Sequence, residues 1–81
     1  MAITAAQSRG ARGMLEWTQS ELAEVAGVTQ RAVVDFERDV GLRAAADVTA
    51  IRTALEAAGV EFIAENGGGA GVRLRKATEE R

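Results

Sequence analysis

Residues 18–37 read TQSELAEVAGVTQRAVVDFE, and this stretch decides the fold of the chain. Thr18 and Glu21 have the spacing of a capping box, in which each side chain satisfies an unpaired backbone N–H of the first helical turn. The apolar residues that follow recur at helical spacing: Leu22, Ala23 and Ala26. Gly27 then stands where a left-handed residue ends a helix and reverses the chain. The pattern predicts a helix over residues 19–26 and a tight turn after it.

A second short helix follows the turn. Val28 is an apolar residue between the two helices, and Thr29 is placed to cap the second one, which we expect to end near Arg38. Its buried face would carry Ala32, Val33 and Phe36. Two short helices at this spacing, with Ala where they approach each other, are typical of a helix-turn-helix, whose second helix enters the major groove of DNA.

The same residues resemble the lambda-repressor-like, Xre/Cro-type family of helix-turn-helix regulators. The shared pattern is Thr-Gln-x-x-Leu-Ala-x-x-Ala-Gly-Val-Thr-x-x-x-Val-x-x-Phe-Glu, and the resemblance extends from about Ser8 to Ala58. The chain departs from the family at Asp39, where Gly is frequent, and at Arg43, where Pro is frequent. The resemblance implies a mainly α fold, a lambda-repressor-like bundle of four helices, to which a short C-terminal β-hairpin or strand pair is added here.

The resemblance implies that the first turn of the second motif helix faces base edges. The expected base contacts are Thr29, Gln30, Arg31, Val34 and Asp35. Gln pairs with adenine N6 and N7, and Arg forks onto guanine O6 and N7, although Arg31 could instead rest on a phosphate. Val34 would meet a thymine methyl group. Asp35 would accept from cytosine N4, or would instead orient Arg31 or Arg38.

Phosphate contacts are expected around the same motif: Thr18, Gln19, Arg38 and Arg43. Gln19 begins a helix, where backbone N–H groups favour an anion, and the family uses this Gln on a DNA phosphate. The alternative for Gln19 is a merely solvent-exposed position. Arg38 and Arg43 flank the loop after the second motif helix as phosphate clamps, or, for Arg43, as a minor-groove probe.

The resemblance implies a structural role for Arg12 rather than a contact with DNA. The family pairs an Arg of the first helix with the Glu that ends the second motif helix, and Arg12 and Glu37 occupy those positions. The resemblance therefore implies an ion pair that fixes how the second motif helix is presented.

The rest of the domain is expected to supply two further helices. Residues 4–7 form another capping-box pattern, which predicts a helix running to about Leu15 with an inward stripe of Ala11, Met14 and Leu15. A fourth helix over residues 44–58 would bury Val48, Ile51, Leu55 and Ala58, and Gly59 would stop it.

After Gly59 the spacing of apolar residues changes from that of a helix to the alternation of β-strands. Residues 60–63 and 72–75 are rich in β-formers, and the glycine-rich residues 66–71 form a turn between them. We therefore divide the chain into a helix-turn-helix domain (residues 1–59), a strand extension (60–76) and a frayed tail (77–81). Glu61 opposite Arg73 or Arg75 would help to set the strand register.

A lone hairpin is marginally stable, so the strands must pack on something. They could cover the fourth helix and bury Phe62 and Leu74 against Ile51 and Leu55. We favour instead a role in a homodimer, in which the strands pair across a two-fold axis. The expected dimer interface is Val60, Phe62, Ile63, Val72 and Leu74.

Composition excludes several classes of protein. The 81 residues contain no Cys and no His, which removes disulfides, thiolate zinc sites and imidazole chemistry, and we expect no metal, no cofactor and no enzymatic activity. The glycine-rich stretch lacks the Gly-Lys-Ser/Thr of a phosphate-binding loop. No apolar run approaches membrane-spanning length and no signal-peptide pattern is present, so we expect a cytoplasmic protein without membrane contact.

The net charge is −2, but arginines gather in the N-terminal half, where the DNA face would lie. The sequence thus predicts a sequence-specific regulator of transcription, most simply a repressor, that binds a partly palindromic double-stranded DNA operator as a homodimer and could also touch RNA polymerase. One alternative is the DNA-binding antitoxin of a toxin–antitoxin pair, whose second partner is a small protein. Another is a protein-interaction module that has lost DNA binding.

Overall fold

The computed structural model describes residues 3–38, 44–64 and 67–75 of the chain. The fold is mainly helical, as predicted: α1 (Ala5–Leu15), α2 (Gln19–Ala26), α3 (Gln30–Glu37) and α4 (Ala45–Ala57) precede an antiparallel hairpin of β1 (Val60–Ile63) and β2 (Gly71–Leu74). The predictions for Arg43 and for the tail over residues 77–81 fall outside the described residues. Within the described ranges, no helix has the length and apolarity that crossing a membrane requires.

Threonine caps define where α1, α2 and α3 begin. The Thr4 and Thr18 side chains accept from the backbone N–H groups of Gln7 and Glu21, both at 3.0 Å, and each capping box is completed by the return bond to the cap. Thr29 caps α3 by accepting from the backbone N–H of Ala32 at 3.1 Å. These local hydrogen bonds satisfy N–H groups that have no partner inside the helix, which explains why the helix starts could be placed from sequence.

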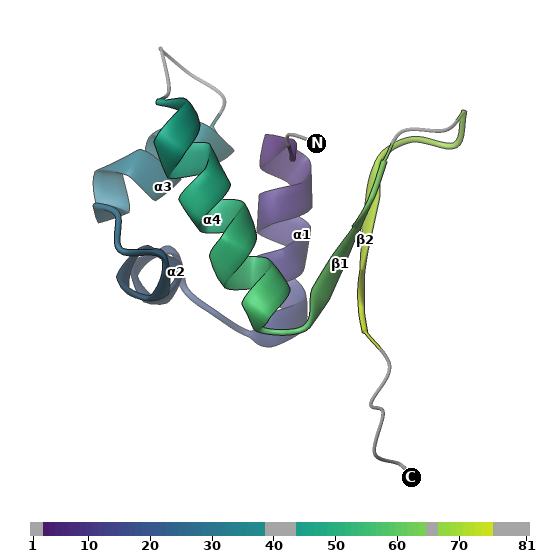
Figure 1. Cartoon of the computed structure of the whole chain (residues 1–81), viewed down its shortest axis with the longest axis horizontal. Coiled ribbons are helices and arrows are strands. Elements are labelled where there is room, and N and C mark those ends of the chain that lie inside the picture. The colour runs from purple at the N-terminus through teal and green to yellow at the C-terminus, as the bar shows by residue number, and fades with distance from the viewer. Residues whose placement is uncertain (1–2, 39–43, 65–66, 76–81) are drawn as a thin grey trace, which may run out of the picture.

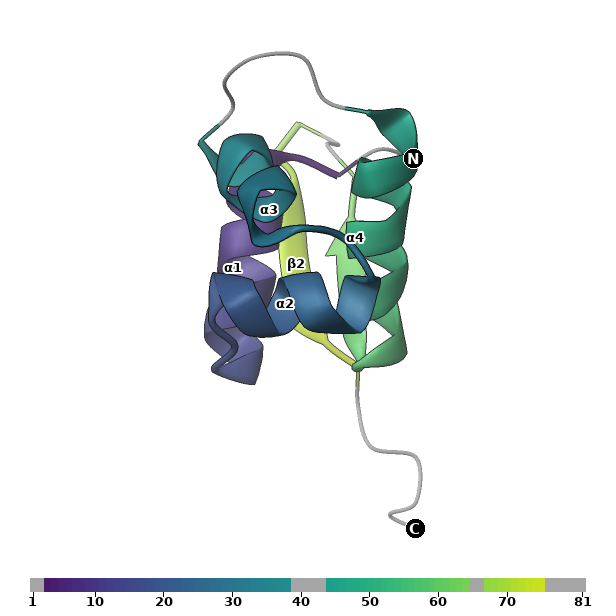
Figure 2. The ribbon, with the colours of Figure 1, turned by 90° about the vertical axis from the view of Figure 1, so that its left-hand side faces the viewer.

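The helix-turn-helix motif, formed by α2 and α3, and the hairpin lie on opposite sides of the molecule. Figure 1 shows α2 and α3 at one side and the hairpin at the other, with α1 and α4 between them, and Figure 2 shows the α2–α3 side face on. The buried core joins all four helices and the first strand: Ile3, Ala11, Leu22, Ala23, Val33, Phe36, Ile51, Ala54, Leu55 and Val60. The motif is therefore fixed to the rest of the domain through apolar packing.

The hairpin packs on α1 and α4, with β2 against α1 and β1 against α4. The buried Gln7 side chain holds it there, because its Nε2 donates to the Gly71 carbonyl at 2.8 Å and to the Ile63 carbonyl at 3.2 Å. Gly10 makes the close approach possible, since a Cβ at this position would lie 3.3 Å from Cγ2 of Val72. The hairpin is thus packed within its own chain rather than held only by a second one.

Strand register places Glu61 opposite Arg73, as predicted, and Val60 opposite Leu74. Phe62 and Val72 are partly buried against the core, but Leu74 is 51% exposed. The alternative in which α4 covers both Phe62 and Leu74 is therefore wrong for Leu74. The reason is that β2, which carries Leu74, packs against α1, whereas β1 is the strand that packs against α4.

The inward stripe of α1 also differs from the predicted one. Met14 is 40% exposed, whereas the polar Gln7 and Ser8 are buried together with Ala11. At 100° per residue, Ser8 and Ala11 share the face that meets the other helices, and Met14 is rotated toward the strand side. An apolar pattern alone could not reveal this, because two of the buried positions are polar.

Candidate nucleic-acid interface

The first turn of α3 is exposed to solvent. Thr29, Gln30 and Arg31 are all exposed, and they follow a turn in which Gly27 adopts a left-handed conformation with φ of 74°. The Thr29 hydroxyl is engaged as the helix cap but can still donate its own hydrogen. The structure thus brings together, on one exposed turn, three of the five side chains at which the sequence predicted base contacts.

The opposite face of α3 anchors the helix. Val33 is completely buried and Phe36 is 3% exposed, and both belong to the core. Val34 and Asp35 are half-buried on the next turn, beside the exposed first turn. The polar side chains therefore project from a helix whose position is fixed by packing, which is the arrangement that base readout requires.

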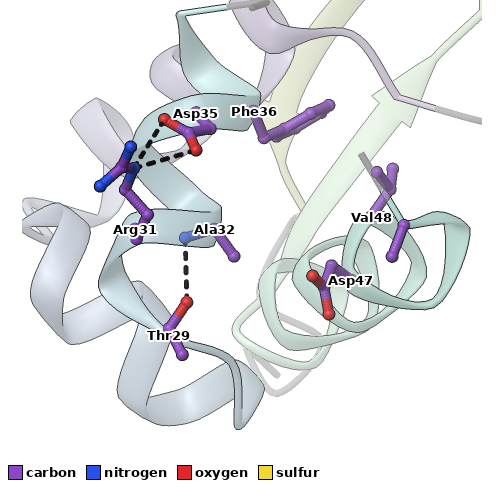
Figure 3. A pocket seen from close by; sticks show the side chains of 8 residues that line it. Thr29, Arg31, Ala32, Asp35, Phe36, Asp47 and Val48 are labelled. Carbon is purple, nitrogen blue, oxygen red and sulfur yellow. Dashed lines mark hydrogen bonds and ion pairs between the residues drawn. The ribbon is translucent and has the colours of Figure 1, made fainter. Parts of the chain in front are cut away.

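Arg31 and Asp35 form an ion pair one turn apart on α3. The Arg31 Nε donates to both carboxylate oxygens of Asp35, at 3.3 and 3.1 Å. Figure 3 shows the pair at the edge of a cleft of about 200 Å³ between α3 and the beginning of α4. The cleft is lined by Thr29, Arg31, Ala32, Asp35, Phe36, Ala44, Asp47 and Val48. The structure thus shows the contact with Arg31 that one of the two roles predicted for Asp35 would use.

At the other end of α3, Glu37 is the centre of a buried polar cluster. Its side chain is 1% exposed and forms an ion pair with Arg12, whose Nη2 lies 2.7 Å from Oε1 and whose Nε donates to both oxygens. The Ser8 hydroxyl donates to Oε2 at 2.6 Å. The remaining terminal nitrogen of Arg12 donates to the Trp17 carbonyl at 3.0 Å, which ties the corner before α2 to the same cluster. The ion pair expected from the resemblance is therefore present.

Two further residues join the cluster in ways that the sequence did not suggest. The Gln19 side-chain amide donates to Glu37 Oε1 at 3.2 Å, and the Arg9 guanidinium donates to the Glu37 backbone carbonyl at the end of α3. Gln19 is half-buried, so the solvent-exposed alternative considered for it is wrong. Ser8 was also missed; its spacing of four residues from Arg12 was the available signal, since both fall on one helical face.

The environment of Glu37 shifts its acidity. Burial raises the pKa of the carboxyl group, whereas hydrogen bonds from Arg12, Ser8 and Gln19 and the charge of Arg12 lower it. The lowering effects are the larger in sum, so the pKa of Glu37 lies below its ordinary value. The folded protein therefore holds this carboxylate as an anion more strongly than the unfolded chain does.

This shift predicts how stability depends on pH. A carboxylate with a depressed folded pKa stabilises the fold fully above its unfolded pKa of about 4.3, and this contribution is lost as the pH falls through the folded pKa. We expect the difference in Tm between the wild type and Glu37→Gln to be largest near neutral pH and to shrink below about pH 4.3. Glu24→Gln, which removes an exposed carboxylate of α2, is the control and should follow the wild type. A wild-type to Glu37→Gln difference that does not change with pH would contradict an anionic Glu37.

The residues expected at phosphates lie around this face. Thr18 is exposed at the start of α2, where its hydroxyl caps the helix, and Gln19 follows it with one amide hydrogen engaged by Glu37. Arg38 is exposed at the end of α3. The face also carries negative charge, because Glu21 and Glu24 are exposed on α2. Among the described residues no group of three or more acidic side chains is positioned to hold a metal ion.

No family model matches the chain, and no curated protein matches it.

Proposed function

We propose that this protein is a sequence-specific double-stranded DNA-binding regulator of transcription, with α3 as the reading helix. The observation that carries the proposal is the exposed first turn of α3, which presents Gln30 and Arg31 while Val33 and Phe36 fix the helix to the core. Side chains of this kind match the hydrogen-bonding pattern of base edges in the major groove.

In the proposed complex, α3 lies in the major groove and α2 crosses the sugar-phosphate backbone. Gln30 pairs with adenine N6 and N7, and the terminal nitrogens of Arg31 bind guanine O6 and N7. The start of α2 offers backbone N–H groups and the second amide hydrogen of Gln19 to a phosphate. The Glu37 cluster supports this contact, because it connects the start of α2 to the end of α3 and so fixes the distance between backbone and base contacts.

Selection of bound sequences from a random pool of double-stranded DNA tests the proposal most directly. We expect an enriched motif, and affinity for it that falls with rising salt because contacts to phosphates release counterions. Anisotropy titration on the enriched sequence and on a scrambled one gives the specificity ratio. Equal affinity for the two sequences would reject specific DNA binding and would favour a protein-interaction module, for which the exposed Glu21 and Glu24 beside the reading helix are the supporting observation.

We extend the proposal to a homodimer that forms through the hairpin side of the molecule (Figure 1). Val60 is completely covered within its own chain, which removes it from the predicted interface, whereas Leu74 is 51% exposed. Gln7 bonds to Gly71 and Gly10 contacts Val72, so α1 and β2 run in the same direction. The exposed Met14 lies one turn beyond Gly10, at the end of the hairpin where Leu74 lies.

We predict that Leu74→Glu weakens the dimer at least about tenfold, because it places a charge in an apolar contact. Light scattering at micromolar concentration measures the mass of each variant. Val25→Glu is the matched control, since Val25 is 56% exposed on α2, and Figure 1 shows α2 on the side of the molecule opposite the hairpin. Unchanged dimerisation in Leu74→Glu, or equal loss in both variants, would show that the hairpin end does not form the interface.

A further inference from the structure

The Arg31–Asp35 pair occupies only one edge of the guanidinium group. Both Asp35 oxygens are bonded to Nε, which leaves the two terminal nitrogens with their N–H donors. In Figure 3 the dashed lines to Asp35 leave the guanidinium from one nitrogen only. In the described part of the chain, no other hydrogen bond or ion pair to Arg31 is formed, and its side chain is 83% exposed. The end of the guanidinium is therefore free to bind a ligand.

Stability does not account for this pair. It joins two side chains on a solvent-exposed face, with 83% and 36% of their surfaces accessible, and ion pairs of this kind add little to folding. Asp35 also places a negative charge on the surface that must approach phosphates, which weakens binding to any DNA sequence. A residue that costs affinity and adds little stability at this position requires a reason.

We propose that Asp35 is a specificity-determining residue that positions Arg31 for guanine, an inference that rests on the proposed DNA-binding function. By holding Nε, Asp35 presents the two terminal nitrogens end-on, in the geometry that guanine O6 and N7 accept. By repelling phosphates, it also disfavours the alternative in which the long Arg31 side chain turns to the backbone and binds every sequence alike. Asp35 thus lowers the affinity for DNA of any sequence and raises the preference for guanine at the base pair that Arg31 contacts.

This role differs from a direct contact of Asp35 with cytosine. Both carboxylate oxygens bind Arg31 in the structure, so Asp35 affects recognition only of the base pair that Arg31 contacts. Substitution of Asp35 should then relax the same base-pair position as substitution of Arg31. A direct contact would instead relax a different position.

The test compares binding of each variant to the selected operator and to operators with the guanine replaced. For the wild type, a bidentate Arg–guanine contact predicts a preference of roughly 5- to 150-fold. Asp35→Asn should lower the preference for guanine until it differs by no more than about threefold from the preference measured for Arg31→Ala. The same substitution should raise the affinity for scrambled DNA. Asp35→Glu, which keeps the carboxylate, should restore part of the preference.

Asp47→Asn is the matched control, because Asp47 lines the same cleft and its loss changes the net charge equally. It should raise affinity for all sequences without changing the preference for guanine. In the Arg31→Ala background, Asp35→Asn should likewise change affinity alone. Thermal melts of these variants should coincide with the wild type, which excludes an effect through folding.

The outcomes separate this inference from the proposed function. If the wild type selects an operator but Asp35→Asn keeps the wild-type preference for guanine, or relaxes a different position, the positioning role is overturned and DNA binding stands. An operator whose recognition does not depend on Arg31 also overturns it. If the wild type itself shows no sequence preference, the proposed function fails, and the role of Asp35 fails with it.

Discussion

The Arg12→Met variant is expected to be about 3 kcal/mol less stable than the wild type, the lower end of the effect of removing one partner of a buried ion pair. The Glu37 carboxylate that remains is 1% exposed and would lose the only positive charge that the described residues place on its side chain. Ser8 and Gln19 continue to donate hydrogen bonds to the carboxylate, and these bonds limit the loss of stability. In a domain of this size the change corresponds to a fall in Tm of more than about 10 °C.

Thermal and urea denaturation of a double-mutant cycle measure the effect. Arg73→Met is the matched control, because Arg73 pairs with Glu61 at 2.8 Å on the exposed face of the hairpin and is itself 68% exposed. Its loss should cost less than about 1 kcal/mol. The double variant Arg12→Met with Glu37→Leu should recover much of the stability, since apolar side chains of similar size can replace a buried ion pair. Additive single effects would show that Arg12 and Glu37 stabilise the fold independently.

The helical part of the fold could be predicted because its signals are local. The capping threonines Thr4, Thr18 and Thr29 and the left-handed Gly27 act on backbone groups within a few residues, so their spacing in the sequence contains the full interaction. The alternating residues of the two strands were visible for the same reason. Short-range hydrogen bonds and periodicity therefore determined most of the element boundaries.

The arrangement of the hairpin could not be predicted, because it depends on contacts between distant residues. Gln7 was recognised as half of a capping box, and nothing in its neighbourhood indicates that its amide also binds the carbonyls of Ile63 and Gly71. Gly10 gives no local signal for its contact with Val72 either. Such contacts join α1 to a strand some sixty residues later, and only the folded chain brings them together.

The candidate site also contains residues that could be predicted from the sequence and residues that could not. The exposure of Thr29, Gln30 and Arg31 follows from their place in the first turn of α3, and the resemblance placed Arg12 with Glu37. The participation of Ser8 and Gln19 in the Glu37 cluster depends on how three helices meet, and a pattern of apolar and polar residues does not encode it.

The second large effect is expected at the DNA contacts themselves. Arg31→Ala should lose about 1–3 kcal/mol of binding free energy on the selected operator and should relax one base-pair position in each half-site. Arg38→Ala removes an exposed charge at the end of α3 and should instead weaken binding to all sequences by a similar factor, with a salt dependence reduced by about one counterion. Anisotropy titrations at several salt concentrations distinguish the two behaviours.

The contrast between these two variants decides how α3 is used. Arg31 is four residues before Asp35 and projects from the turn that begins the helix, whereas Arg38 follows its last turn, so a helix that enters the groove by its N-terminal end gives them different roles. If Arg31→Ala weakens scrambled and selected DNA equally, Arg31 contacts the backbone and α3 does not read bases through its first turn. If Arg38→Ala alters base preference instead, the helix lies in the groove with its other end inward, and the proposed orientation of α2 across the backbone is wrong.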